Sequence, residues 1–170
     1  MPLVKGNNIV SDDFATLGDE DAIPATGNVL IPAARFLADA DSILARDGKV
    51  GVIWPNNKDI EELAPYLPRL DAVALVFPTF RDGRAYSQSR ILRERYAYKG
   101  EVRATGQVLR DQFVFMLRAG FDAFAVKKEA DAEAFANVAK RYSVFYQPAA
   151  DGRPTAFRRR MAFHAVSASS

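Results

Sequence analysis

The sequence contains no cysteine and only one histidine, and both shortages exclude chemistry. Without cysteine there is no disulfide framework, no thiolate nucleophile and no thiolate ligand for zinc or an iron–sulfur cluster. His164 alone cannot supply a zinc site with several imidazoles in one subunit, and a Ser-His-Asp triad would have to recruit it from near the chain end. We therefore expect no metal site. An enzyme built from this chain would work with carboxylates, arginine, lysine, tyrosine or a borrowed cofactor.

Signatures of nucleotide, nucleic-acid and membrane binding are also missing. Neither GxGxxG nor GxxxxGK[ST] occurs, so no Rossmann or Walker loop supports nucleotide binding. The formal net charge is only +2, and no RNP-type aromatic motif is present, so we expect no nucleic-acid partner. No apolar run approaches the roughly 20 residues that span a bilayer, and the N-terminus lacks the apolar stretch of a secretory signal. We expect a cytoplasmic protein with no membrane partner.

What remains is the composition of one globular domain, with 49% hydrophobic and 26% charged residues in 170. Short apolar runs alternate with segments of helical periodicity, so one helix is predicted between each pair of strands. The predicted strands are 28–31, 50–54, 71–77, 101–104, 121–126 and 143–146.

This alternation predicts an α/β domain over residues 1–170, with a mostly parallel five- or six-stranded sheet and helices packed on it. An open, doubly wound sheet is the favoured architecture, and a partial TIM-like barrel is the alternative. Residues 1–20 are expected to form an N-terminal hairpin. The polar, basic tail over 149–170 is expected to be partly flexible.

Seven arginines fall within one stretch, 81–110, between apolar strands. Ligands of open parallel sheets bind beyond the carboxyl ends of the strands, where helix N-termini favour anions. Three loops of this chain meet that description, and Lys58, Arg84 and Arg103 would add positive charge to them. Arg103 and Thr105 should point the same way, because they are two residues apart on one strand. The three loops are 55–58, 79–84 and 105–107.

The candidate ligand-binding residues share a place at this loop edge. They are Asp82, Arg84, Ser87, Arg90, Arg103, Thr105, Asp111 and Gln112.

Two interpretations of this set stay open: an open pocket for a small anion, or a structural network of ion pairs. Asp82 or Ser87 could simply cap the following helix, and Asp111 could be a favourable acid in a first helical turn. Arg93, Arg95, Arg110 and Arg118 are interpreted as a solvated face or as members of surface ion pairs, and Trp54 as a core residue.

One long motif is specific enough to resemble a known family. Residues 77–124, FPTFRDGRAYSQSRILRERYAYKGEVRATGQVLRDQFVFMLRAGFDAF, are similar to the bacterial domain-of-unknown-function 934 family. The opening MPLVKGNNIV and the later Tyr146-Gln147-Pro148 extend the likeness over most of the chain. The chain departs from the family pattern at Ala85 and Ala97, where glycine is common, and at Gln107, where aspartate is common.

The resemblance implies a role in sulfur metabolism, because such proteins tend to be encoded beside sulfite reductase and other sulfate-assimilation genes. The first expectation is an accessory protein of assimilatory sulfate or sulfite reduction, which binds an oxyanion, the sulfite reductase or another enzyme of the pathway. Family members often carry the label probable oxidoreductase. The second expectation is thus an oxidoreductase or lyase that acts on an anionic substrate with a borrowed flavin or nicotinamide cofactor. The third is a structural homodimer.

Overall fold

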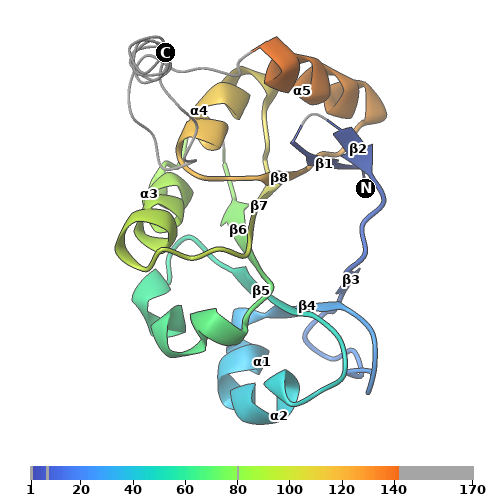
Figure 1. Ribbon diagram of the computed structural model, residues 1–170, viewed down its shortest axis with the longest axis vertical. Helices are drawn as coiled ribbons and strands as arrows, with labels where there is room; N and C mark the ends of the chain where they lie inside the picture. Colours follow the sequence, from blue (N-terminus) through green and yellow to red (C-terminus); the bar gives the residue numbers. More distant parts are fainter. Residues whose placement is uncertain (1, 7, 80, 142–170) are drawn as a thin grey trace, which may run out of the picture.

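A computed structural model describes residues 2–6, 8–79 and 81–141, and it contains one curled sheet of eight strands (Figure 1). The strand order across the sheet is β2-β1-β8-β7-β6-β5-β4-β3. The strands are β1 (Leu3–Lys5), β2 (Asn8–Val10), β3 (Ala15–Thr16), β4 (Val29–Pro32), β5 (Val50–Trp54), β6 (Ala72–Phe77), β7 (Glu101–Gly106) and β8 (Ala123–Ala125).

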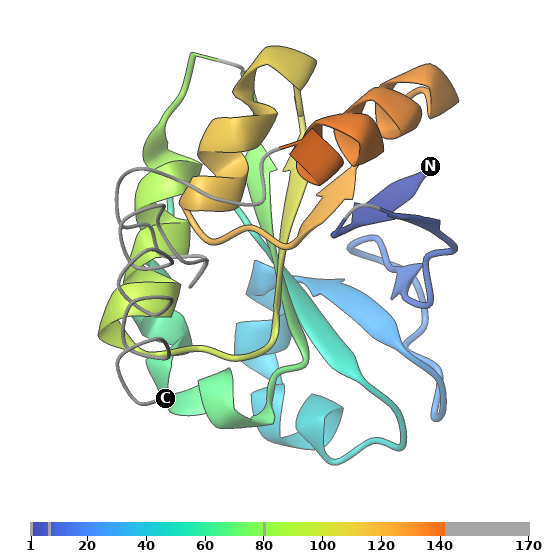
Figure 2. The same ribbon diagram turned by 45° about the horizontal axis from the view of Figure 1, so that its top comes forward.

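The helical segments follow the strands on the outside of this sheet (Figures 1 and 2). They are α1 (Ala33–Ala38), α2 (Ala40–Leu44), the 3₁₀ helix η1 (Ile60–Arg69), α3 (Arg84–Arg90), the π-helix η2 (Ile91–Arg95), the 3₁₀ turn η3 (Arg110–Gln112), α4 (Phe113–Arg118) and α5 (Glu129–Arg141).

The sheet is wound in one direction only. Strands β3 to β8 are parallel and adjacent in chain order, so right-handed crossovers place every connecting helix on the same face. The predicted mostly parallel sheet with packed helices is confirmed, and so is the alternative of a partial barrel. The favoured doubly wound arrangement is wrong, because it needs helices on both faces. The sheet is also larger than predicted, since β1 and β2 add two antiparallel strands beyond β8.

The N-terminal segment connects the two edges of the sheet. The hairpin expected over 1–20 comprises only β1 and β2, whereas β3 pairs in parallel with β4 at the opposite edge. Only residues 11–14, here called the edge linker, separate Val10 from Ala15. Five residue steps span at most about 18 Å, so the two edges must approach each other. This short crossing is the reason the sheet curls into a partial barrel.

The main hydrophobic core lies between the convex face of the sheet and the helices. Trp54, Leu75 and Phe77 are fully buried there, as expected for Trp54. Small side chains such as Ala72 and Ala74 line the concave face instead. This contrast leaves room inside the curl.

Local sequence explains the irregular helices. Pro65 and Pro68 lie inside η1, and an α-helix is disfavoured there because proline lacks an N–H and clashes with the preceding turn. The helical segment after β6 begins at Arg84 and continues as a π-helix from Ile91. Between β7 and β8 the helical segment is short and consists of η3 followed by α4.

The predicted strand 143–146 and the tail 149–170 lie outside the described residues. In the described part of the chain, no helix has the length and apolar character needed to cross a membrane.

Candidate functional site

The concave face of the curled sheet encloses a cavity of about 340 Å³. Arg103 and Thr105 both line it, as predicted from their spacing on β7. The rest of the lining is mostly apolar and comes from six other strands and the edge linker. The lining residues are Leu3, Asp12, Phe14, Thr16, Leu30, Ile53, Ala74, Arg103, Thr105 and Ala125.

Arg103 is the centre of a four-residue ion network in this cavity. Its side chain is only 3% exposed, and it donates two hydrogen bonds to Asp12, from Nη1 to Oδ2 at 2.7 Å and from Nη2 to Oδ1 at 3.1 Å. Its Nε donates to Glu101 at 2.7 Å, and Glu101 also pairs with Lys5 at 2.6 Å. The Phe14 ring lies 5.5 Å from the guanidinium carbon. Two cations and two carboxylates therefore balance one another.

The network changes the proton affinity of its members. Burial raises the pKa of Asp12, but hydrogen bonds from Arg103 and from the Phe14 backbone outweigh it, and the pKa is lowered below its usual value. Burial lowers the pKa of Arg103, and the two carboxylates reverse this and raise it. Both residues are charged at neutral pH, as an ion pair requires.

Asp82 and Arg84 pair with each other at the start of α3. The Asp82 carboxylate accepts hydrogen bonds from the Arg84 backbone N–H at 3.1 Å and from Arg84 Nη2 at 2.7 Å. The side-chain hydrogen bond from Arg84 holds the pKa of Asp82 well below its usual range. The chain's own carboxylate thus occupies the position where an anion was expected.

Lys58, on the loop after β5, also has partners within the chain. It forms an ion pair with Glu62 at 3.1 Å, and its Nζ lies 5.6 Å from the centre of the Trp54 ring. Gln88 of α3 holds the same loop by donating from Nε2 to the carbonyls of Pro55 and Lys58. The loop over 55–58 is therefore held by contacts within the chain.

A groove of about 500 Å³ lies between α3 and α4. Its described lining is Tyr86, Arg90, Gln112, Phe115 and Arg118, here called the α3–α4 groove. The Tyr86 hydroxyl donates to Gln112 Oε1 at 3.3 Å, and burial raises the pKa of Tyr86 to about 12. Phe115 is 62% exposed. Among the described residues, Arg90 makes no ion pair or hydrogen bond.

The structure divides the predicted site residues among several places. Arg103 and Thr105 share the inner cavity, whereas Arg90 and Gln112 share the α3–α4 groove. Asp82 and Arg84 form their own pair. Ser87 is exposed on α3 and Asp111 is exposed on η3, and neither lines the cavity or the groove. Arg84, Arg103 and Asp111 therefore do not form one pocket.

Sequence reasoning missed the acidic partners of Arg103. Asp12 lies 91 positions away on the edge linker, in a segment interpreted only as part of a hairpin. Glu101 and Arg103 are two residues apart on one strand, so their side chains share a face of the sheet. This spacing could have identified Glu101 as a partner of Arg103. No local signal points to Asp12.

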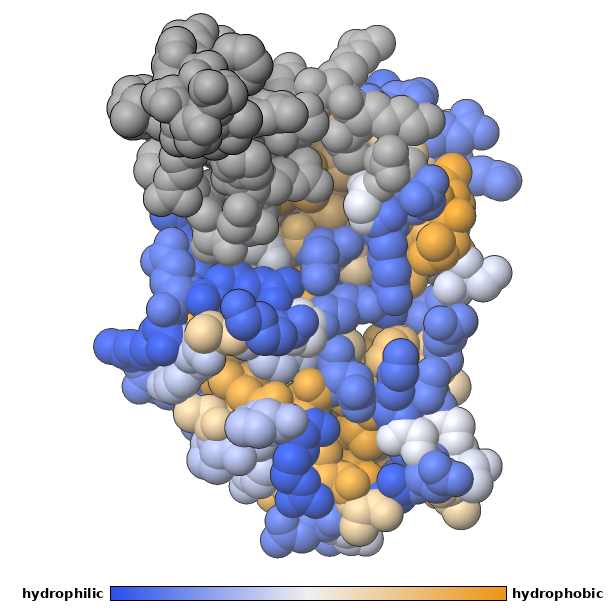
Figure 3. All heavy atoms as spheres, viewed as in Figure 1, coloured by the Kyte–Doolittle hydropathy of each residue, from blue (hydrophilic) through white to orange (hydrophobic). Residues whose placement is uncertain are grey.

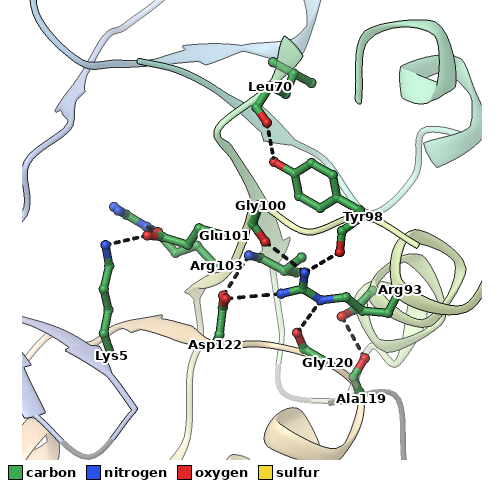
Figure 4. Close-up of polar contacts among 12 residues, drawn as sticks. Lys5, Leu70, Arg93, Tyr98, Gly100, Glu101, Arg103, Ala119, Gly120 and Asp122 are labelled. Carbon is green, nitrogen blue, oxygen red and sulfur yellow. Dashed lines mark hydrogen bonds and ion pairs between the residues drawn. The ribbon is translucent and has the colours of Figure 1, made fainter. Parts of the chain in front are cut away.

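Arg93 is a structural clamp, which corrects the prediction of an arginine on a solvated face or in a surface ion pair. It donates to the carbonyls of Tyr98, Gly100 and Gly120 at 2.7 to 2.9 Å and pairs with Asp122 at 3.2 Å (Figure 4). Its side chain is 13% exposed. It ties the segment after η2 to the turn that follows α4.

The family model described as "Bacterial protein of unknown function (DUF934)" matches residues 51–157, more than half of the chain. The chain belongs to this family. A search of curated proteins found no match. In this DUF934 protein the matched region includes Arg103, Glu101 and the whole α3–α4 groove, whereas Asp12 and Phe14 of the edge linker lie outside it.

The inner cavity and the α3–α4 groove are the two concave sites available for binding among the described residues discussed above. In the described part of the chain, no group of three or more His, Cys, Asp or Glu side chains could hold a metal ion. The inner cavity offers apolar walls with one buried arginine. The α3–α4 groove offers the exposed Phe115 together with two arginines. The described part of the face drawn in Figure 3 shows hydrophobic residues interspersed among hydrophilic ones.

Proposed function

We propose that this DUF934 protein is an accessory protein of assimilatory sulfate and sulfite reduction, which binds sulfite reductase or another enzyme of that pathway through the α3–α4 groove. The observation that carries the proposal is the exposed Phe115 beside Arg90. The pathway follows from the resemblance to proteins encoded beside sulfite reductase genes.

The groove has the composition of a protein-binding surface. Aromatic residues and arginine are enriched where protein interfaces hold most of their binding energy. Phe115 is the most exposed of the large hydrophobic residues described, and Leu109, 40% exposed, precedes η3 and α4. Arg90 lines the groove and is exposed, and none of the described lining residues is acidic, so the matching partner surface carries an acidic residue beside an apolar side chain.

Oxyanion binding at the predicted loop edge has weaker support. Arg84 and Arg103 already contact carboxylates of the same chain, so an external oxyanion would have to displace them. Arg90 faces no such competitor among the described residues. We therefore place the main binding surface at the groove.

Deletion of the gene tests the pathway. We expect the deletion strain to grow poorly with sulfate as sole sulfur source and normally with cysteine. Growth should return with the wild-type gene and not with the Phe115→Ser variant. Normal growth of the deletion strain on sulfate would contradict the proposal.

Binding of purified sulfite reductase tests the surface. We expect Phe115→Ser to weaken binding at least tenfold, corresponding to about 1.4 kcal/mol or more. Ile9→Ser is the matched control, because Ile9 is another exposed apolar residue, 44% exposed on β2. Equal binding by both variants would place the contact elsewhere. Light scattering of the protein alone measures its molar mass and so tests the alternative that the protein is a homodimer.

A second function has one specific observation in its favour. The inner cavity reaches the ends of β7 and β8, where parallel sheets commonly hold ligands. An oxidoreductase or lyase acting on an anionic substrate with a borrowed cofactor would use this cavity. We expect its thermal unfolding temperature to rise with flavins, pyridine nucleotides or adenylylated sulfate if this function holds. No rise with any of them would eliminate it.

A further inference from the structure

Arg103 is held as a carboxylate receptor. Its two terminal nitrogens form parallel hydrogen bonds with both oxygens of Asp12, which is the bidentate geometry by which arginine binds carboxylate ligands. Its remaining Nε donates to Glu101, whose other oxygen contacts Lys5. Glu101 therefore neutralises Lys5 and orients Arg103. The two terminal nitrogens of Arg103 make no hydrogen bond with Glu101, so they can bind a second carboxylate, which is Asp12 in this structure.

Asp12 is the less firmly held partner of the pair. Its side chain is 29% exposed, against 3% for Arg103, and it belongs to the edge linker, which has no helix or strand of its own. Phe14, on the same linker, packs over the Arg103 guanidinium. The linker thus covers the cavity with one carboxylate and one aromatic ring, while β7 holds the arginine rigidly in the sheet.

The cavity beside this pair suits a small molecule with an apolar body. Its volume of about 340 Å³ falls within the range of small-ligand pockets, at the lower end. Leu30, Ile53 and Ala74 provide apolar walls, and the Thr105 hydroxyl adds a polar group near the end of β7. These walls favour a monocarboxylate with a short apolar body over a strongly hydrated dianion such as sulfate.

We propose that Arg103 binds the carboxylate of a small apolar-bodied acid, and that Asp12 occupies this position in the free protein. Exchange of one carboxylate for the other keeps the charge balance around Arg103 and Lys5. The displaced Asp12 moves into water, where its charge is solvated. The site is distinct from the α3–α4 groove and does not depend on a role in sulfur metabolism.

Calorimetry with hexanoate, hexanol and sulfate tests the proposal on three proteins. We expect wild type to bind hexanoate, and Asp12→Asn to bind it about tenfold more tightly, because the internal competitor for Arg103 is weakened. Asp13→Asn is the matched control on the same linker, and it should bind as wild type does. Hexanol and sulfate should bind none of the three measurably.

Four results would overturn the proposal. These are no binding of hexanoate to Asp12→Asn, equal affinity of wild type and Asp12→Asn, hexanol binding as tight as hexanoate binding, and an equal response to sulfate. Arg103→Lys should lose hexanoate binding, because lysine lacks the planar fork. If this variant does not fold, the comparison of Asp12→Asn with wild type and Asp13→Asn decides the question alone.

Discussion

Arg103 and Asp12 lie 91 positions apart and are joined by two hydrogen bonds inside the curl of the sheet. One residue comes from β7 in the middle of the sheet, and the other comes from the linker between its two edges. The pair therefore fastens the linker across the concave face. Its loss should weaken the closure of the partial barrel.

The contribution of Asp12 to stability should depend on pH. Its pKa is lowered in the folded protein from the ordinary 3.8, so the charged carboxylate stabilises the fold above that value. Protonation as the pH falls through the lowered pKa removes the stabilisation. The difference in unfolding free energy between wild type and Asp12→Asn should thus be full at pH 7 and shrink below 3.8, as measured by urea denaturation. A difference that stays constant down to pH 2.5 would contradict this.

Substitution of Arg93 should lower the unfolding free energy more than substitution of an exposed arginine. Arg93→Met removes the donors to three backbone carbonyls and the Asp122 ion pair, so we expect a loss of about 3 kcal/mol of unfolding free energy. Arg93→Lys should recover part of it. Arg95→Met is the matched control, since Arg95 pairs with Glu61 on the exposed surface and has no other ion pair among the described residues, and it should lose less than about 1 kcal/mol. Equal losses for Arg93→Met and Arg95→Met in guanidinium denaturation would show that the clamp contributes nothing.

The sequence was sufficient for the elements whose signal is local. Apolar runs and intervening helical periodicity predicted β4 to β8 to within a few residues. The direction of Arg103 and Thr105 followed from strand geometry alone.

The rest depended on contacts between distant segments. Whether a parallel sheet winds once or twice is decided by strand order, which periodicity does not encode. The closure by residues 11–14 depends on β1 pairing with β8, more than a hundred residues later. Arg93 was predicted to be on the surface for the same reason, because its carbonyl partners belong to turns that only tertiary packing brings beside it. The arginines of one sequence stretch therefore lie in different places. Arg93 forms the clamp, Arg84 pairs with Asp82, Arg103 lines the inner cavity, and Arg90 lines the α3–α4 groove.

Ala97 provides a test of the departures from the family pattern. It is the only described non-glycine residue with a positive φ, at 49°, and it is exposed. Left-handed backbone costs a residue with a Cβ about 1–2 kcal/mol, partly offset by the greater freedom of glycine in the unfolded chain. Ala97→Gly should therefore raise the unfolding free energy by about 0.5 kcal/mol.

Ala85→Gly is the matched substitution with the opposite expected sign. Ala85 is fully buried in α3, where glycine lowers helix stability by about 1 kcal/mol. Thermal denaturation of the two variants should shift the midpoint in opposite directions. A lower midpoint for Ala97→Gly would mean that other contacts outweigh the backbone strain.

Arg90 should control how fast a partner reaches the α3–α4 groove. An exposed cation beside Phe115 attracts an acidic surface, so Arg90→Glu should lower the association rate constant with sulfite reductase and weaken its dependence on salt. Arg69→Glu is the control with the same change of charge, because Arg69 lies on η1 in a weak pair with Asp41 at 3.8 Å. Surface plasmon resonance at several salt concentrations separates the two variants. If both slow association equally, net charge rather than the groove steers the encounter, and Arg90 has no part in the contact.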